Sequence, residues 1–208
     1  MATDVESLNA LGVVTMEMIR TFVAIELSDA FKGTLVRVQE GLKRAPAGRL
    51  VRWVAPEGIH LTLKFLGDIS PSRVDEIARA LSETCRALSP FELTLSHTGF
   101  FPDAHRLRVV WVGLAGAVDE LNRLQRAVED GMNSLGFRPE GRGFQPHLTL
   151  GRVRDFARPA EREELAKRVL AAQVDEQPRM LVREVHLIRS DLRPTGAVYT
   201  SLAVAPLG

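Results

Sequence analysis

Two of the five histidines in this 208-residue chain lie in identical tetrapeptides, His-Leu-Thr-Leu at 60–63 and at 147–150. Each tetrapeptide belongs to an apolar run typical of a β-strand, at 59–67 and at 143–153. Side chains alternate between the two faces of a strand, so the histidine and the threonine share one face while the leucines anchor the other face in the core. This repeated polar pair is the strongest indication of chemistry in the sequence.

The residue types in the repeated pair are suited to holding and cleaving a phosphate ester. A threonine hydroxyl, as in Thr62 and Thr149, can donate to a phosphate oxygen. A histidine, with an ordinary pKa of about 6.5, gives or takes a proton near neutral pH. If the two strands face each other across a cleft, one imidazole can deprotonate an attacking water while the other protonates the leaving oxygen. We expect structural or surface roles for the remaining histidines, His97, His105 and His186.

Other kinds of site find no support in the sequence. It has no H-E-x-x-H, no P-loop and no G-x-G-x-x-G, and its single cysteine, Cys85, allows neither a disulfide nor a cysteine-based zinc site. We therefore expect no metal and no cofactor, and a reducing, cytoplasmic setting. The net charge is only +1, so a phosphate-binding surface has to be a local patch.

Helices and strands alternate along the chain, which predicts an α+β fold. Strands are expected at 20–27, 59–67, 91–101, 107–115, 143–153, 180–192 and 197–205, and helices at 30–45, 71–88, 117–136 and 161–172. The segment 45–58 is predicted to be mostly loop. Two predicted hairpins, 91–115 and 180–205, favour antiparallel or mixed sheets over a doubly wound parallel sheet.

The order of elements also repeats. A loop, a strand with the tetrapeptide, a helix and a further strand occur once in each half, which predicts a duplicated α+β unit. Residues 1–18 are predicted to be an N-terminal extension, and residues 19–208 a single domain of two lobes. No stretch approaches the roughly 20 apolar residues that span a bilayer, so we expect no membrane partner. The oligomeric state stays open, with a monomer as the default expectation.

The paired tetrapeptides resemble the H-x-T-x repeats of the 2H phosphoesterase superfamily. With their flanks, RTFVAIEL, IHLTLKFLGDIS, LRVVWVGL and FQPHLTLGR in this order, they resemble the RNA 2′,3′-cyclic phosphodiesterases, historically called 2′-5′ RNA ligases, from Arg20 to the C-terminus. The resemblance implies two lobes with pseudo-two-fold symmetry and both strands lining a central cleft. It also implies metal-independent hydrolysis of an RNA terminal 2′,3′-cyclic phosphate to a 2′-phosphomonoester. RNA ends, tRNA fragments among them, are the implied partners.

The resemblance also implies roles for individual residues. His60 is the implied proton donor and His147 the implied proton acceptor, while Thr62 and Thr149 are the implied phosphate ligands. Neither role of the histidines follows from the residues themselves, because the two halves are nearly symmetric.

Arg152 matches a basic position common in the family and is a candidate phosphate ligand. Strict alternation places Arg152 on the face opposite His147, so this role requires the strand to end or bend at Gly151. By the same alternation, Lys64 is expected on the His60 face as a surface lysine, and Phe65 on the leucine face.

Two further functions stay open at this point. The same two histidines could join RNA ends through a 2′-5′ bond, which is the reverse reaction. A module that binds RNA ends without cleaving them is the alternative from another class, although such proteins usually carry a basic excess.

Overall fold

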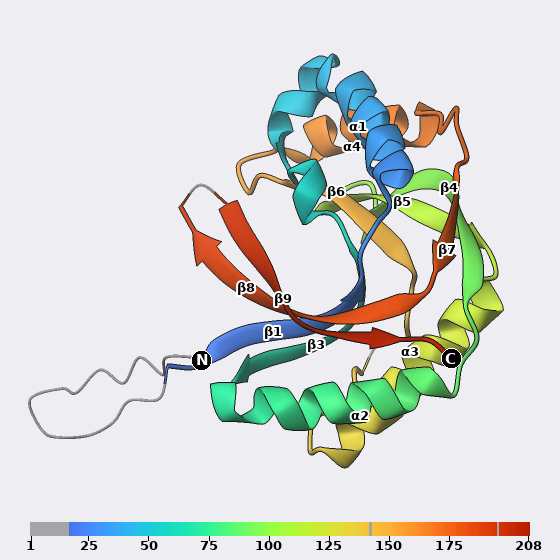
Figure 1. Cartoon of the computed structure of the whole chain (residues 1–208). Coiled ribbons are helices and arrows are strands. Elements are labelled where there is room, and N and C mark those ends of the chain that lie inside the picture. The colour runs from blue at the N-terminus through green and yellow to red at the C-terminus, as the bar shows by residue number, and fades with distance from the viewer. Residues whose placement is uncertain (1–16, 142, 195) are drawn as a thin grey trace, which may run out of the picture.

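A computed structural model describes residues 17–141, 143–194 and 196–208, and most of the predicted extension, 1–16, lies outside these ranges. The elements, labelled in Figure 1, are β1 (Ile19–Ile25), α1 (Asp29–Lys43), η1 (Pro46–Leu50), β2 (Val51–Trp53), η2 (Pro56–Gly58), β3 (Leu61–Ile69), η3 (Pro71–Arg73), α2 (Val74–Arg86), β4 (Phe91–Phe101), β5 (Val109–Gly116), α3 (Val118–Ser134), β6 (His147–Val153), α4 (Pro159–Ala171), β7 (Arg179–Val182), β8 (Glu184–Arg193) and β9 (Gly196–Pro206).

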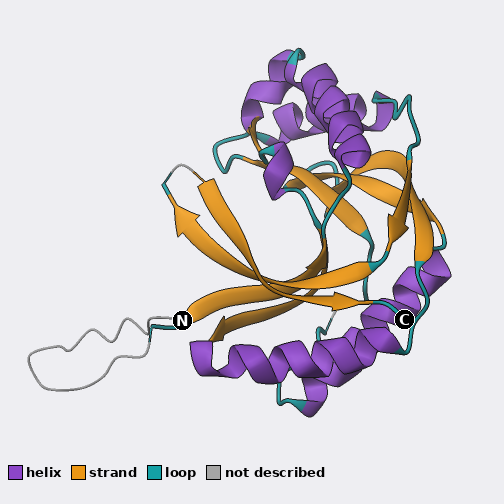
Figure 2. Cartoon of the chain, in the orientation of Figure 1, coloured by secondary structure: helices purple, strands orange, loops and turns teal. Residues whose placement is uncertain are grey.

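The strands form two sheets, which Figure 2 shows in orange between the helices. The first sheet has the order β3-β1-β8-β9 and the second the order β2-β6-β5-β4-β7. Every neighbouring pair is antiparallel. The predicted α+β class is confirmed, and the sheets are antiparallel rather than mixed.

The helices form because their apolar residues recur at helical spacing and meet the sheets. Ser28 accepts a hydrogen bond from the Phe31 N–H and caps α1. On the next two long helices, apolar residues at helical spacing are fully buried, whereas Val74, Ala78 and Leu88, at the same spacing, are only partly buried. The fully buried ones are Ile77, Leu81 and Cys85 on α2, and Leu121, Leu124, Val128 and Met132 on α3.

The predicted repeat is present as β3–α2–β4 and β6–α4–β7. The helices that precede these units cross over between the halves. Gln39 of α1 donates a hydrogen bond to the carbonyl of Leu150 in β6, and Gln125 of α3 donates one to the carbonyl of Leu63 in β3. Each half therefore supplies a helix to the sheet that contains the other half's tetrapeptide, and one hydrophobic cluster joins both sheets.

Two boundary predictions are wrong. The expected strand at 180–192 is two strands in different sheets, because β7 pairs with β4 while β8 pairs with β1 and β9. Arg183 separates them. The segment predicted to be mostly loop, 45–58, contains the short edge strand β2, which pairs with β6. Alternation within a continuous apolar run does not reveal where a chain leaves one sheet for another.

Both strands with the tetrapeptide carry a β-bulge at its second leucine. Between β1 and β3 the register passes from Ala24↔Thr62 to Val23↔Lys64, which leaves Leu63 as the extra residue. Between β5 and β6 it passes from Trp111↔Thr149 to Val110↔Gly151, which leaves Leu150 as the extra residue. Past each bulge, the faces of the strand are exchanged relative to a regular strand.

The bulge in β3 overturns two predictions. Lys64, expected at the surface, is 0% exposed and lies on the core side with Val23, where its Nζ contacts Glu129 Oε1 of α3 at 2.6 Å and the carbonyl of Arg138 at 2.9 Å. Phe65, expected in the core, is 56% exposed. An extra residue in a bulge cannot be read from strict alternation.

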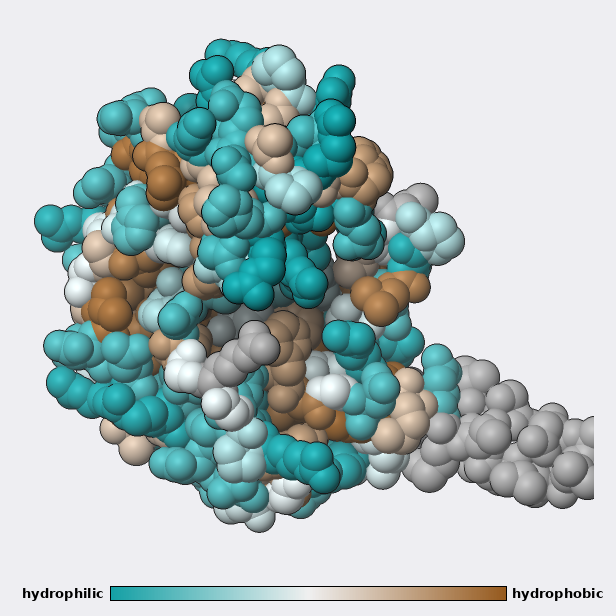
Figure 3. All heavy atoms as spheres, turned by 180° about the vertical axis from the view of Figure 1, so that it is seen from behind, coloured by the Kyte–Doolittle hydropathy of each residue, from teal (hydrophilic) through white to brown (hydrophobic). Residues whose placement is uncertain are grey.

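One face of the molecule is largely hydrophilic (Figure 3). On the face shown in Figure 3, hydrophobic side chains gather in small separate groups among hydrophilic ones. Within the described segments, no helix is both long and apolar enough to cross a membrane.

Replacing Glu129 with alanine is expected to lower the free energy of unfolding by about 3 kcal/mol, because the buried Lys64 would lose its carboxylate partner. Urea unfolding followed by circular dichroism measures the change. Glu164→Ala is the matched control, since its ion pair with Arg168 joins side chains that are 51% and 59% exposed, and it should cost less than about 1 kcal/mol. Equal losses in the two variants would show that Lys64 does not depend on Glu129.

Candidate active site

Each sheet carries one tetrapeptide on a face that we call its motif face. On the first sheet, the motif face holds His60, just before β3, together with Thr62. Thr62 pairs with Ala24 of β1, and Ala24 belongs to a small cluster with Phe22, Ile188 and Tyr199 that is separate from the main core. This arrangement matches the predicted division into leucines in the core and a His-Thr pair on the other face.

His60 lies in an aromatic environment. Its ring stacks on Phe22 with the ring centroids 4.7 Å apart and meets Tyr199 edge-on at the same centroid distance. Burial among these rings, together with the nearby positive charge of Lys32, lowers the pKa of His60 to about 4. The imidazole is therefore neutral at pH 7 in the free protein.

On the second sheet, His147 and Thr149 open β6 and are both partly buried. Thr149 is paired with Trp111 of β5, and the His147 ring lies edge-on to Phe101 of β4 at 5.0 Å. Gly99 makes room for the Trp111 ring, since a Cβ at this position would overlap it. At least one aromatic ring thus packs against the histidine of each tetrapeptide.

A backbone carbonyl orients the His147 ring. Its Nδ1 lies 2.7 Å from the carbonyl oxygen of Gln145, and because a carbonyl only accepts, Nδ1 carries the proton. In the neutral imidazole, Nε2 is then the nitrogen with a free lone pair. This arrangement suits His147 to accept a proton at Nε2.

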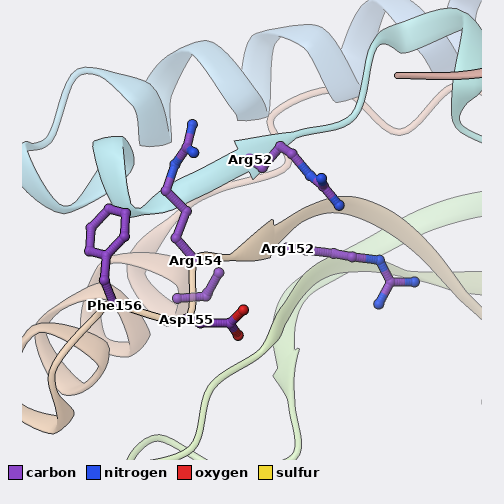
Figure 4. Close-up of a pocket in the computed structure, with 6 residues that line it drawn as sticks. Arg52, Arg152, Arg154, Asp155 and Phe156 are labelled. Carbon is purple, nitrogen blue, oxygen red and sulfur yellow. The ribbon is translucent and has the colours of Figure 1, made fainter. Parts of the chain in front are cut away.

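The bulge in β6 places Arg152 on the motif face. Arg152 pairs with Val109, on the same side of the sheet as the pair formed by Trp111 and Thr149. For Arg152 to lie on the His147 face, the strand has to bend near Gly151. The bulge at Leu150, one residue earlier, provides this bend. Figure 4 shows the Arg152 guanidinium extended away from its strand.

Charges from both sheets act on Tyr199. Burial raises the pKa of the Tyr199 phenol, while the positive charges of Arg152 and Arg20 oppose this rise. Arg152 belongs to the second sheet, whereas Tyr199 contacts His60 of the first. The charge of Arg152 on the second sheet therefore acts on an aromatic neighbour of His60.

The three remaining histidines take part in other contacts. His105 pairs with Glu163 at the surface, and His186 is buried between Ser201 and Glu184. The His97 ring lies 5.5 Å from the Trp111 ring. Within the described ranges, no group of three or more His, Cys, Asp and Glu side chains is arranged to hold a metal ion.

The aromatic and basic neighbours of the candidate site residues do not follow from the sequence pattern. These residues are Phe22, Lys32, Arg52, Phe101, Trp111 and Tyr199. Three of the six, Phe22, Arg52 and Trp111, lie on strands adjacent to the motif strands β3 and β6, so strand pairing brings them beside these strands.

Comparison with known proteins identifies the family. A family described as the 2′-5′ RNA ligase superfamily matches residues 36–194. The chain belongs to this superfamily. It is 38% identical to the RNA 2′,3′-cyclic phosphodiesterase of Methanothermobacter thermautotrophicus, over 89% of this chain and 97% of that protein. It is 30% identical to the protein of the same name from Aquifex aeolicus, over 93% of this chain and 100% of that protein.

Solved structures of the superfamily have the same fold. E. coli LigT complexed with 3′-AMP superposes with a TM-score of 0.69 at 26% identity, covering 92% of this chain and 99% of LigT. The family that the tetrapeptides and their flanks resemble is thereby confirmed, and so is the α+β fold.

The pKa of His60 is expected to be about 4 in the free protein and to rise when Lys32 is replaced by methionine, because one of the two causes of its depression is removed. NMR titration of the His60 ring protons measures both values. Lys167→Met, on α4, is the control and should leave the titration unchanged. An unaltered His60 titration in Lys32→Met would show that the ammonium group does not act on the ring.

The same depression makes stability depend on pH. The unfolded chain binds a proton at His60 below about pH 6.5, whereas the folded protein binds it only near pH 4, so the contribution of His60 to stability decreases as the pH falls from 6.5 to 4. His60→Gln should make the free energy of unfolding less dependent on pH within this window.

Proposed function

We propose that the protein hydrolyses the 2′,3′-cyclic phosphate at the end of an RNA to a 2′-phosphomonoester, with His60 and His147 as the acid–base pair. The observation that carries the proposal is the pair of His-x-Thr strands on two sheets, in a chain 38% identical to a protein named RNA 2′,3′-cyclic phosphodiesterase. No step requires a metal ion, so the reaction proceeds without one.

His147 accepts the proton of the attacking water at Nε2, the nitrogen left free by the hydrogen bond to Gln145. The water oxygen forms a bond to phosphorus, and the bond from phosphorus to the 3′ oxygen breaks. His60 gives its proton to this leaving oxygen, so the ribose keeps a 2′-phosphate and regains its 3′ hydroxyl. Return of a proton from His147 to His60 through solvent completes the cycle.

His60 has to be protonated when it donates. With a pKa of about 4, roughly one molecule in a thousand carries this proton at pH 7 in the free protein. A bound phosphate places a negative charge beside the ring, and such a charge raises the pKa of a histidine. Binding of the substrate therefore favours protonation of His60. Before binding, burial among aromatic rings keeps His60 neutral.

Thr62, Thr149 and Arg152 hold the phosphate. The two hydroxyls donate to its non-bridging oxygens, and the Arg152 guanidinium neutralises part of its charge. The proposed partners are RNA ends with a cyclic phosphate, tRNA fragments among them. The protein acts on them as a monomer, in the cytoplasm.

A short RNA ending in 2′,3′-cyclic phosphate, incubated with the protein in EDTA, is expected to give the 2′-phosphomonoester. His60→Ala and His147→Ala should each lower kcat by about 10²–10⁴-fold, since each removes a proton-transfer group. Chromatography of the product against 2′- and 3′-phosphate standards measures the outcome, and His105→Ala serves as the control at the surface.

The other functions predict different results in the same assay. RNA that binds without being cleaved would replace the proposal by a module that holds RNA ends. Full turnover in either histidine variant would reject the two-histidine mechanism. Addition of an RNA with a 5′ hydroxyl tests 2′-5′ joining, which would give a longer, 2′-5′-linked product.

Thr62→Val and Thr149→Val are expected to lower kcat/KM by about tenfold or more each, because each removes one hydrogen bond to a charged phosphate while keeping the shape of the side chain. Steady-state kinetics with the same RNA measures the effect. The buried Thr98 on β4, which donates to the carbonyl of Val169, offers a matched control: Thr98→Val should act on stability instead. A kcat/KM unchanged in both tetrapeptide variants would exclude the hydroxyls as phosphate ligands.

A further inference from the structure

Two arginines lie side by side on neighbouring strands of the second sheet. Arg52 on β2 is directly opposite Arg152 on β6, and the register between these strands is regular. Directly opposed residues of an antiparallel pair present their side chains on the same face. Arg52 therefore lies on the motif face with Arg152, and Figure 4 shows both guanidinium groups extended in the same direction.

The charges of this pair are not balanced within the protein. Like charges directly opposite each other on two strands are destabilising, yet none of the ion pairs in the described segments includes Arg52 or Arg152. Both side chains are exposed. An anion between them would relieve the repulsion.

The surroundings of the pair are positively charged and hollowed. A depression of about 450 Å³ is lined by three arginines and one aspartate, together with a valine and a phenylalanine: Arg52, Arg152, Arg154, Asp155, Val153 and Phe156. Positive charge is thus concentrated here, although the whole chain carries a net charge of only +1. Figure 4 shows Arg154 and Phe156 directed away from the Arg52–Arg152 pair.

We propose that Arg52 binds the backbone phosphate that precedes the terminal cyclic phosphate, so that the site recognises the end of an oligoribonucleotide. This inference rests on the proposed function, which places the cyclic phosphate beside Arg152. Strand β2 is the edge strand beyond β6, so Arg52 lies one strand spacing, about 4.8 Å, further out. A guanidinium binds the two oxygens of a phosphodiester through two parallel hydrogen bonds.

Comparison of two substrates distinguishes binding of the backbone phosphate by Arg52 from the hydrolysis of the cyclic phosphate. A nucleoside 2′,3′-cyclic monophosphate has only the reacting phosphate, whereas a trinucleotide ending in 2′,3′-cyclic phosphate also has backbone phosphates. In Arg52→Ala, the ratio of kcat/KM for the trinucleotide to kcat/KM for the mononucleotide is expected to fall about tenfold. The slope of log kcat/KM against log salt for the trinucleotide should become shallower by about 0.7, the value for one phosphate contact on a single strand.

The controls identify the contact. Arg79→Ala, an exposed arginine on α2, should leave the ratio unchanged, and Arg52→Lys should recover part of the loss because it keeps the charge without the guanidinium fork. Arg152→Ala should lower kcat/KM for both substrates. An unchanged ratio and salt slope in Arg52→Ala would overturn the inference.

Binding gives a readout that does not need turnover. Fluorescence anisotropy of a labelled trinucleotide with a 3′-terminal phosphate should show about tenfold weaker binding to Arg52→Ala than to the unaltered protein. If the unaltered protein hydrolyses neither substrate, the proposed function fails. If it hydrolyses both but Arg52→Ala binds the trinucleotide equally well, only the role of Arg52 fails.

Discussion

The β-bulge at the second leucine of each tetrapeptide is the constraint on which the site depends. In a regular strand, Arg152 would point into the core, where an unpaired charge is costly. The bulges turn the sixth residue of each run, Phe65 or Arg152, to the motif face. Because the carbonyls of Leu63 and Leu150 accept hydrogen bonds from the buried Gln125 and Gln39, a shift of either strand would leave a buried amide unpaired. Helix packing and site geometry are thereby coupled.

The duplicated strands give their two histidines different surroundings. His60 is packed among aromatic rings near a lysine, which favours its neutral form, and His147 is fixed by a backbone carbonyl that leaves Nε2 free. The tetrapeptides are identical, so the difference arises entirely from neighbouring elements: Phe22, Lys32 and Tyr199 on one side, and Gln145 on the other. The proposed roles of His60 as proton donor and His147 as proton acceptor require such a difference between two nearly symmetric halves.

Much of the fold and the centre of the site could be predicted from the sequence, because both rest on periodicity. The buried stripes of α2 and α3, the capping Ser28 and the leucine faces of the tetrapeptides follow from spacing alone. The position of Lys64, the environment of Tyr199 and the register of Arg52 depend on strand pairing and on bulges, which join residues far apart in the chain. A local sequence pattern shows the two-residue period of a strand. It does not show which strand pairs with it or where a bulge inserts an extra residue.

The residue that follows the bulge differs between β3 and β6 because the two strands have different neighbours. Strand β3 is at the edge of its sheet, and the residue after its bulge, Lys64, reaches Glu129 of α3. Strand β6, in contrast, is paired along one edge with β2. Gly151, which occupies the position of Lys64, has no space for a side chain because Val51 lies against it. The same strand brings Arg52 beside Arg152. The edge strand β2 therefore both requires a glycine at position 151 and places Arg52 beside Arg152, so that positive charge gathers on the second sheet while aromatic rings pack around His60 on the first.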